Sequence, residues 1–335
     1  MAIIEAVALR KVFRARERRP GIVGAIAAVF APHYVDKVAV DDVSFALDGG
    51  EVVGYIGPNG AGKSTTIKML TGILVPTSGV LRVAGIVPHA HRTANAANIG
   101  VVFGQRSQLY WDLPLRESFE LLRSIYDVPR DRYRQNMRHF AEILDLDRFL
   151  DTPVRQLSLG ERMRGDFAAA MLHDPKIVYL DEPTIGLDVV AKEAIREFIL
   201  RVNQERGTTV ILTTHDLADV ERLARRIILI DSGTVIYDGL LERLRDEYGT
   251  HRTLVVNLAE PYPEFMVAGA DVVSREANLV RLRFNRRSIT AEALIRRVTE
   301  RYQITDVSII EPDIESIVRT IYREGYHDGP ARAPS

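Results

Sequence analysis

Eight residues near the start of the chain constrain its fold more than any other feature. They read Gly57-Pro58-Asn59-Gly60-Ala61-Gly62-Lys63-Ser64 and lie between the apolar run Val52 to Ile56 and a helix-forming stretch. This is the pattern of a P-loop, in which glycines let backbone N–H groups and a helix N-terminus point at phosphate oxygens. It predicts ATP or GTP binding, with Lys63 on the β- and γ-phosphates, Ser64 on Mg²⁺ and Thr65 completing the nucleotide-binding set.

From Ala39 onward, apolar runs of strand length alternate with amphipathic helical runs. This alternation is typical of an α/β fold with a parallel core sheet and crossover helices. Further buried strands are expected at Ile177 to Leu180 and Thr209 to Thr213. Over residues 106–170 we expect a helical subdomain, whose apolar helix faces are Leu115, Phe119 and Leu122, then Tyr133, Met137, Phe140 and Leu144.

The pattern changes near residue 250, where a βαβ-like alternation begins again. Strands are expected at 253–258, 272–275 and 279–284, and helices at 289–302 and 314–322. We interpret residues 250–326 as a small C-terminal α+β domain without a readable catalytic motif, and predict a regulatory or dimerisation role for it. Residues 327–335 are rich in Pro, Gly and Ala, which predicts a disordered tail.

Acidic and imidazole side chains follow two of the predicted core strands. Asp181 and Glu182 end the strand that begins at Ile177, and His215 follows the strand that ends at Thr213. A P-loop alone also fits kinases, helicases and GTPases, but these residues add the parts that nucleotide hydrolysis needs. Asp181 is placed to hold Mg²⁺, Glu182 to take a proton from water, and His215 to contact the γ-phosphate.

An ordered set of motifs extends this reading over roughly residues 1–245. After the P-loop come Gln105, the segment Leu157-Ser158-Leu159-Gly160-Glu161, Asp181-Glu182-Pro183-Thr184, Gly186-Leu187-Asp188 and His215. In this order the chain resembles the nucleotide-binding subunits of ABC transporters. The resemblance implies an ATPase domain of ABC type, with an antiparallel β subdomain and a helical subdomain beside the parallel core, in residues 1–245.

The family resemblance also implies a head-to-tail pair with two ATP molecules in the shared interface. Each ATP would contact the P-loop of one subunit and the signature segment of the other, through Ser158 and Gly160. Gln105 would sense Mg²⁺ and the attacking water, and Asp188 would cross the interface. Phe13 is the best match for the aromatic residue that stacks on adenine, with Tyr34 as the second choice.

The chain departs from the family pattern at two places. Leu159 and Glu161 stand where the signature usually has Gly and Gln, while Gly160 is retained, so hydrolysis is still expected. The second departure is an insertion over residues 14–37. Its apolar run could form a short interfacial helix against a permease or lipid headgroups, or an enlarged β-hairpin loop; the residues on its helical face are Ile22, Ile26, Val29 and Phe30.

The insertion 14–37, the segment Val102 to Pro114 and the C-terminal domain resemble the ATP-binding subunits of daunorubicin-type exporters, and more closely those of the viologen-exporter type. In such proteins, the segment Tyr110 to Pro114 would meet the coupling helix of the permease; the alternative is ordinary packing of Trp111 in the helical subdomain. We therefore expect an ATPase subunit that powers a separate membrane permease and exports drugs or other small molecules. Its second ATPase subunit would be another copy or a related chain.

Composition argues against several other classes of protein. Net charge is −1, from 44 basic and 45 acidic residues, which gives no indication of a nucleic-acid partner. The chain has no cysteine, which fits a reducing cytosol. The longest apolar run, 21–31, is too short for the roughly 20 residues that span a bilayer, and no secretory signal is expected. We expect a peripheral protein on the cytoplasmic face of the bacterial plasma membrane.

Two other function classes stay open on the sequence alone. One is a soluble ABC ATPase acting on ribosomes or nucleic acid, although members of that class carry two such domains or long coiled coils. The other is a regulatory nucleotide-binding module without turnover, which Glu182 and His215 disfavour. The transported substrate is not indicated, because that pocket belongs to the permease.

Overall fold

The computed structural model describes residues 2–16, 34–104 and 106–324, and the chain divides into two compact units, 1–238 and 239–335. The predicted disordered tail, 327–335, lies outside the described residues. None of the described helices is long and apolar enough to cross a membrane.

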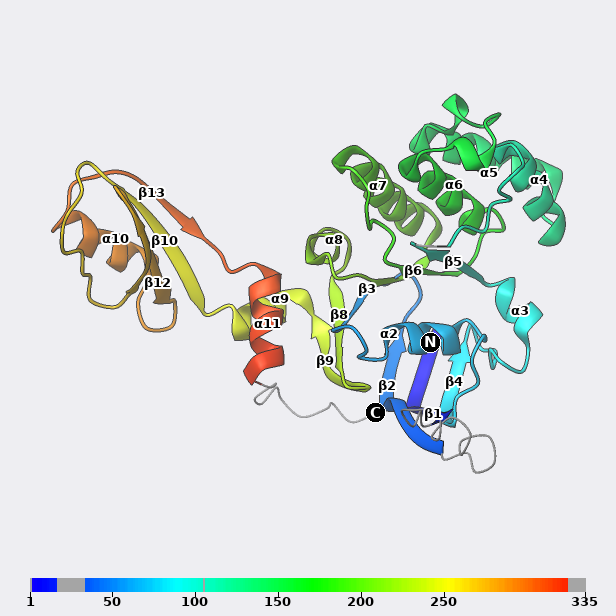
Figure 1. Ribbon diagram of the computed structural model, residues 1–335, viewed down its shortest axis with the longest axis horizontal. Coiled ribbons are helices and arrows are strands. Elements are labelled where there is room, and N and C mark those ends of the chain that lie inside the picture. The colour runs from blue at the N-terminus through cyan, green and yellow to red at the C-terminus, as the bar shows by residue number, and fades with distance from the viewer. Residues whose placement is uncertain (1, 17–33, 105, 325–335) are drawn as a thin grey trace, which may run out of the picture. The chain divides into compact units, whose positions relative to one another are not determined.

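A six-stranded sheet forms the centre of the first unit (Figure 1), with its strands in the order β5-β6-β7-β3-β8-β9. The strands are β3 (Val52–Ile56), β5 (Ile99–Phe103), β6 (Ile177–Asp181), β7 (Thr209–Thr213), β8 (Arg226–Asp231) and β9 (Thr234–Leu240). The pairs from β5 to β8 are parallel, as the predicted crossover pattern requires. Crossover and covering helices are α2 (Lys63–Leu70), α3 (Arg92–Ala96), α7 (Val189–Arg206) and α8 (Leu217–Leu223).

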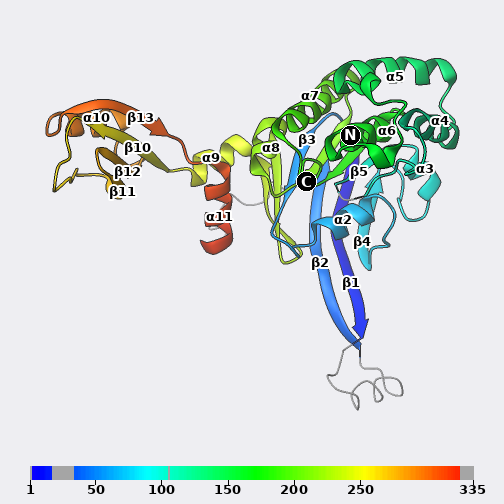
Figure 2. The ribbon, with the colours of Figure 1, turned by 45° about the horizontal axis from the view of Figure 1, so that its top comes forward.

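An antiparallel sheet of three strands shares a hydrophobic core with the six-stranded sheet and α2. Its order is β2-β1-β4, from β1 (Ile4–Arg16), β2 (Tyr34–Leu47) and β4 (Ser78–Val83). β1 and β2 run side by side along their whole length (Figure 2), with Arg14 opposite Asp36 and Arg16 opposite Tyr34. The two ends of the predicted insertion 14–37 are therefore strand. The proposed helical run from Ile22 to Phe30 lies outside the described residues.

Three helices form the predicted helical subdomain, α4 (Leu115–Ile125), α5 (Arg130–Leu144) and α6 (Leu159–Met171). They group together beside the β5 and β6 end of the core sheet (Figure 1). Their predicted apolar faces are buried, except that Met137 is only half-buried and Asn136 takes the core position beside it. Asn136 is accommodated there because its Nδ2 donates to the carbonyl of Leu172 (3.0 Å) and to Asp174 (3.1 Å).

The second unit contains a four-stranded sheet in the order β11-β12-β10-β13. Its elements are α9 (Leu241–Tyr248), β10 (His251–Leu258), β11 (Asp271–Glu276), β12 (Leu279–Asn285), α10 (Ala291–Thr299), β13 (Ile304–Ile310) and α11 (Ile314–Glu324). β12 and β13 both pair antiparallel with β10, so the β12-α10-β13 segment is a βαβ unit split by a central strand. Leu254, Val280 and Leu294 lie in a core of their own.

Candidate nucleotide-binding site

The P-loop joins β3 to α2 in a conformation that its glycines make possible. Gly60 and Gly62 have φ values of 88° and 106°, a left-handed region that side chains avoid. A Cβ on Gly62 would lie 2.6 Å from the carbonyl oxygen of Ala39, and one on Gly57 would lie 2.5 Å from that of Ile230. The loop is therefore packed tightly against β2 and β8, while Pro58 and Asn59 at its tip are exposed and Ala61 is buried.

Helix α2 presents its first backbone N–H groups at the end of this loop. Thr66 N donates to the carbonyl of Gly62 (2.9 Å), whereas Lys63, Ser64 and Thr65 lie in the first turn, where an α-helix offers no internal acceptor. These three N–H groups and the positive end of the helix dipole form an anion-binding geometry.

The Lys63 ammonium closes over the loop. Its Nζ donates to the carbonyls of Gly57 (2.5 Å) and Pro58 (3.1 Å). Partial burial lowers the pKa of Lys63, and the negative charges of Glu182 and Asp181 oppose that shift. Lys63 thus lies within electrostatic reach of both predicted catalytic carboxylates.

Asp181, at the end of β6, is held by the neighbouring strand. Thr213 at the end of β7 donates its hydroxyl to Oδ1 of Asp181 (2.5 Å). The other carboxylate oxygen has no hydrogen-bond partner among the described residues. Gln105, which is predicted to bind Mg²⁺ together with Ser64 and Asp181, lies outside the described residues.

Glu182 has a strained backbone and a paired side chain. Its φ is 53°, a left-handed value that is uncommon for a non-glycine residue. Its Oε2 lies 2.7 Å from Nδ1 of His215, whose imidazole is largely exposed. His215, predicted to contact the γ-phosphate, is therefore paired with Glu182 in this structure.

The signature segment begins helix α6 with a reciprocal cap. Ser158 is the N-cap: its Oγ accepts from Glu161 N (3.3 Å), while its own N and Oγ both donate to Oε2 of Glu161 (2.8 Å each). The hydrogen bonds from the Ser158 hydroxyl and amide hold the pKa of Glu161 below its ordinary value. Glu161 thus serves as a capping acid at the place where the family usually has Gln.

The signature segment lies against the start of α7 in the same chain. A Cβ on Gly160 would lie 3.2 Å from Cβ of Ala191, and one on Gly186 would lie 3.2 Å from Leu159. Asp188 caps α7 by accepting from Ala191 N (2.8 Å). The next two side chains, Val189 and Val190, are 82% and 80% exposed.

The two adenine candidates lie on the β1–β2 hairpin. Phe13 is 37% exposed, with Nζ of Lys11 5.2 Å from its ring centroid, and Tyr34 is 55% exposed. Both rings are open to solvent, and a stacking role for either stays a prediction.

Sequence reasoning missed the residues that shape this site from neighbouring elements. Thr213 orients Asp181, and a Cβ on Gly104 would lie 2.2 Å from the carbonyl oxygen of Glu182, so only glycine fits there. Both contacts depend on the order of strands in the sheet. Among these residues, only the Gly104-Gln105 pair is part of a motif that is visible in the sequence.

A buried ionic network also joins the helices that follow Asp188 and His215. Asp219 on α8, which is fully buried, accepts from Arg196 of α7 and from Thr184, while Lys192 of α7 lies 2.6 Å from Asp216. This network ties the start of α7 to α8.

Comparison with known proteins identifies the family. Residues 40–185 match the model of the ABC transporter family. The chain is 34% identical over 206 residues to the ABC transporter ATP-binding protein NatA of Bacillus subtilis, covering 62% of this chain and 83% of that protein. It is 36% identical to the Nod factor export ATP-binding protein I of Ralstonia nicotianae, covering 68% of this chain and 74% of that protein.

A further relative is the daunorubicin resistance ATP-binding protein DrrA3 of Streptomyces coeruleorubidus, 36% identical over 67% of this chain and 70% of that protein. Among solved structures, the dimeric post-hydrolysis state of the ATP-binding cassette MJ0796, bound to ADP and Pi, superimposes with a TM-score of 0.59. It is 26% identical and covers 71% of this chain and 98% of that one.

The chain therefore belongs to the ABC transporter family, as an ATP-binding subunit that binds and hydrolyses ATP to power a membrane transporter. The predicted fold class and the predicted resemblance to exporter ATPases are both confirmed. The soluble ribosome or nucleic-acid class is not favoured, because these relatives are transporter proteins.

Proposed function

We propose that this chain works as a head-to-tail pair of ATPase subunits that drives a separate membrane permease to export drugs or other small molecules. The observation that carries this proposal is that each chain exposes two incomplete phosphate sites. One is the P-loop with α2, packed against β2 and β8; the other is the start of α6, packed against α7. Two copies related by a twofold axis would complete both sites.

The surface around the signature segment supports such a pairing. Leu159 (37%), Ile185 (36%), Val189 and Val190 are exposed apolar side chains beside the N-terminus of α6. A cluster of exposed apolar side chains with polar residues beside it is typical of protein–protein interfaces. Asp188, at the same surface, is positioned to cross to the second copy.

The residues at the P-loop fit ATP together with Mg²⁺. Mg²⁺ prefers oxygen ligands and is usually held by one or two protein oxygens and by phosphates. Ser64 offers an exposed hydroxyl, and Asp181 offers the carboxylate oxygen that Thr213 leaves unoccupied. We assign these two residues, with Gln105, to the metal, which would neutralise charge on the phosphates.

Glu182 and His215 supply the proton chemistry. Glu182 is the general base for the attacking water. Before ATP binds, the imidazole of His215 contacts its carboxylate at 2.7 Å. His215 would move from Glu182 to the γ-phosphate when ATP is bound. Lys63 would exchange its two carbonyl acceptors for phosphate oxygens, because charge-assisted bonds to phosphate are stronger than bonds to carbonyls.

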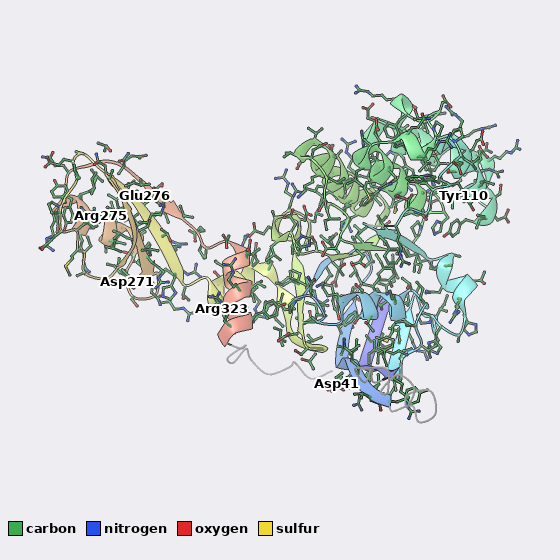
Figure 3. All side chains as sticks on the ribbon, viewed as in Figure 1. Asp41, Tyr110, Asp271, Arg275, Glu276 and Arg323 are labelled. Atoms are coloured by element: carbon green, nitrogen blue, oxygen red, sulfur yellow. The ribbon has the colours of Figure 1, made fainter. Side chains whose placement is uncertain are left out.

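The permease would dock on the helical subdomain. Tyr110 and Trp111 are 43% and 54% exposed, and Tyr110 lies at the edge of this subdomain (Figure 3). The same subdomain has a hollow of about 330 Å³, lined by Leu113, Glu117, Glu120, Leu121 and Ser124. A hollow lined by both leucines and glutamates suits a short amphipathic helix from the permease. This arrangement would place the chain on the cytoplasmic face of the plasma membrane.

For the second unit we propose an accessory role. The sheet of the second unit has its own core, so it can serve as a regulatory or dimer-stabilising domain. Removing residues after Leu240 should leave ATP binding intact and weaken the dimer; lost ATP binding in a folded variant would contradict this assignment.

The Glu182→Gln variant tests the proposed function. The amide keeps the shape of the side chain but accepts no proton, so turnover should fall by about 10²- to 10⁴-fold while ATP binding persists. Light scattering should then detect an ATP-dependent dimer. Turnover close to that of the parent protein would remove Glu182 from the role of base.

A further inference from the structure

Helix α6 holds the segment 107–111 through a buried carboxylate. Asp166 is 2% exposed, and its Oδ1 accepts from the hydroxyl of Ser107 (2.9 Å) and from the backbone N of Gln108 (3.0 Å). In addition, Nε2 of the Gln108 side chain donates to the backbone carbonyl of Asp166 (3.0 Å). The chain directly after Gln105 is therefore fixed to α6 at one point by three hydrogen bonds.

Two neighbouring positions on the same face of α6 extend this attachment. A Cβ on Gly165 would lie 3.0 Å from a methyl carbon of Leu109 and 2.9 Å from one of Leu115, so the missing side chain lets both leucines pack onto the helix. One turn earlier, the guanidinium of Arg162 lies 5.8 Å from the ring centroid of Trp111. Positions three and four residues apart share one helix face, so 162, 165 and 166 form a continuous strip.

This strip connects two surfaces that the proposed function uses for different partners. The segment 107–111 ends in the exposed rings of Tyr110 and Trp111, and α6 begins at Ser158. A helix of 13 residues transmits a displacement of one end to the other as a rigid body. The segment 107–111 forms neither helix nor strand, so its contacts with α6 fix its position.

The chemistry of Asp166 argues for a specific role. Burial raises its pKa to about 6, despite the bonds from Gln108 and Ser107 and the charge of Arg162. Because burial of this acid costs stability, its hydrogen bonds to the segment 107–111 are the contribution that it offers in exchange. A leucine of similar size would fill the same space without this cost, but would give Ser107 and Gln108 no acceptor.

We infer that Asp166 is a positioning residue that locks the segment 107–111 onto helix α6, so that the permease-facing rings and the signature end of the helix move together. This inference rests on the proposed function, in which the signature meets ATP on a second copy. The locking itself is a property of the single chain and is testable in the full-length protein alone.

The chain provides its own reporter, because Trp111 is its single tryptophan. Three variants separate the contacts. Asp166→Leu removes the acceptor, Asp166→Asn keeps Oδ1, and Ser107→Ala removes one of the two donors. Asp151→Asn is the matched control, since Asp151 is an exposed aspartate of the same subdomain that pairs with Arg116.

The first measurement is the fluorescence anisotropy of Trp111 without nucleotide. Asp166→Leu should lower it clearly, Ser107→Ala should lower it less, and Asp166→Asn and the control should leave it unchanged. Parental anisotropy in both Asp166→Leu and Ser107→Ala would overturn the locking. If Asp166→Leu does not fold, the comparison of Ser107→Ala with Asp166→Asn decides the same question.

The second measurement adds ATP and Mg²⁺ in a Glu182→Gln background and follows Trp111 emission and dimerisation together. The parent should change emission as it dimerises; Asp166→Leu should dimerise with its emission change reduced at least twofold, and Asp166→Asn should restore the change. A full response in Asp166→Leu, or a parent that dimerises with no response, would overturn the inference. Absence of any ATP-dependent dimer in the parent would count against the proposed function, while the anisotropy result would still decide the locking.

Discussion

Replacing the buried Asp166 by asparagine should stabilise the first unit, by an amount that depends on pH. The folded pKa of this carboxyl is about 6, raised from 3.8 mainly by burial. A shift of one unit corresponds to about 1.4 kcal/mol, so the ionised side chain costs about 3 kcal/mol of folding free energy above pH 7. Asparagine keeps the Oδ1 acceptor for Ser107 and Gln108 and carries no charge to bury.

The direction of the pH dependence follows from linkage. Because the folded pKa lies above the unfolded one, the folded protein binds the proton more tightly and the parent loses stability as pH rises from about 4 to about 6. The advantage of Asp166→Asn should therefore be about 3 kcal/mol at pH 7.5 and about half of that at pH 5. Below pH 4 the two proteins should be equally stable.

Urea unfolding followed by Trp111 emission measures this difference, because Trp111 lies in the same unit as Asp166. Asp151→Asn should give a difference close to zero at both pH values, since that carboxylate is exposed. An advantage of Asp166→Asn that does not change between pH 5 and pH 7.5, or a variant less stable than the parent at pH 7.5, would contradict a raised pKa for the Asp166 carboxyl.

Substitutions at three further positions test the proposed phosphate sites. Lys63→Ala should weaken ATP binding by about 10- to 100-fold, because it removes a charged donor; unchanged affinity for a fluorescent ATP analogue would contradict this. Gly160→Asp should leave ATP binding to the monomer intact and abolish ATP-driven dimerisation, whereas Gly160→Ala, which meets Ala191 at the same 3.2 Å without a charge, should only weaken it. Equal dimerisation of the two variants would remove the electrostatic argument. Glu161→Gln should strengthen the ATP-bound dimer by about three- to tenfold, since it removes a negative charge beside the incoming phosphate, and a weaker dimer in sedimentation experiments would oppose it.

The sequence predicted the P-loop well because every part of it is local. β3, the glycines and the first turn of α2 are consecutive, and the left-handed conformations of Gly60 and Gly62 are encoded by the glycines themselves. The motif around Asp181 is local too, since an apolar strand that ends in two acids is visible in the sequence.

Contacts between distant segments were not predictable in the same way. The bond from Thr213 to Asp181 exists because β7 lies next to β6, and the pairing of Asp166 with Ser107 bridges 59 positions in the sequence. At the ends of the insertion, Arg14 pairs with Asp36. This pairing continues the antiparallel ladder of β1 and β2, which begins at Ile4 and Leu47. The alternation of apolar and polar side chains along a strand does not indicate the residue at which its pairing with another strand ends.

Disulfide trapping between two copies tests the central claim of a shared interface most directly. The chain contains no cysteine, so Asn59→Cys at the exposed tip of the P-loop and Leu159→Cys beside the signature serine can be introduced singly, each in a Glu182→Gln background. In a head-to-tail pair, a mixture of the two variants should form a covalent dimer under mild oxidation when ATP and Mg²⁺ are present, and neither variant should do so alone. A mixture that stays monomeric with saturating ATP, or cross-linking as strong within each single variant, would contradict a head-to-tail arrangement.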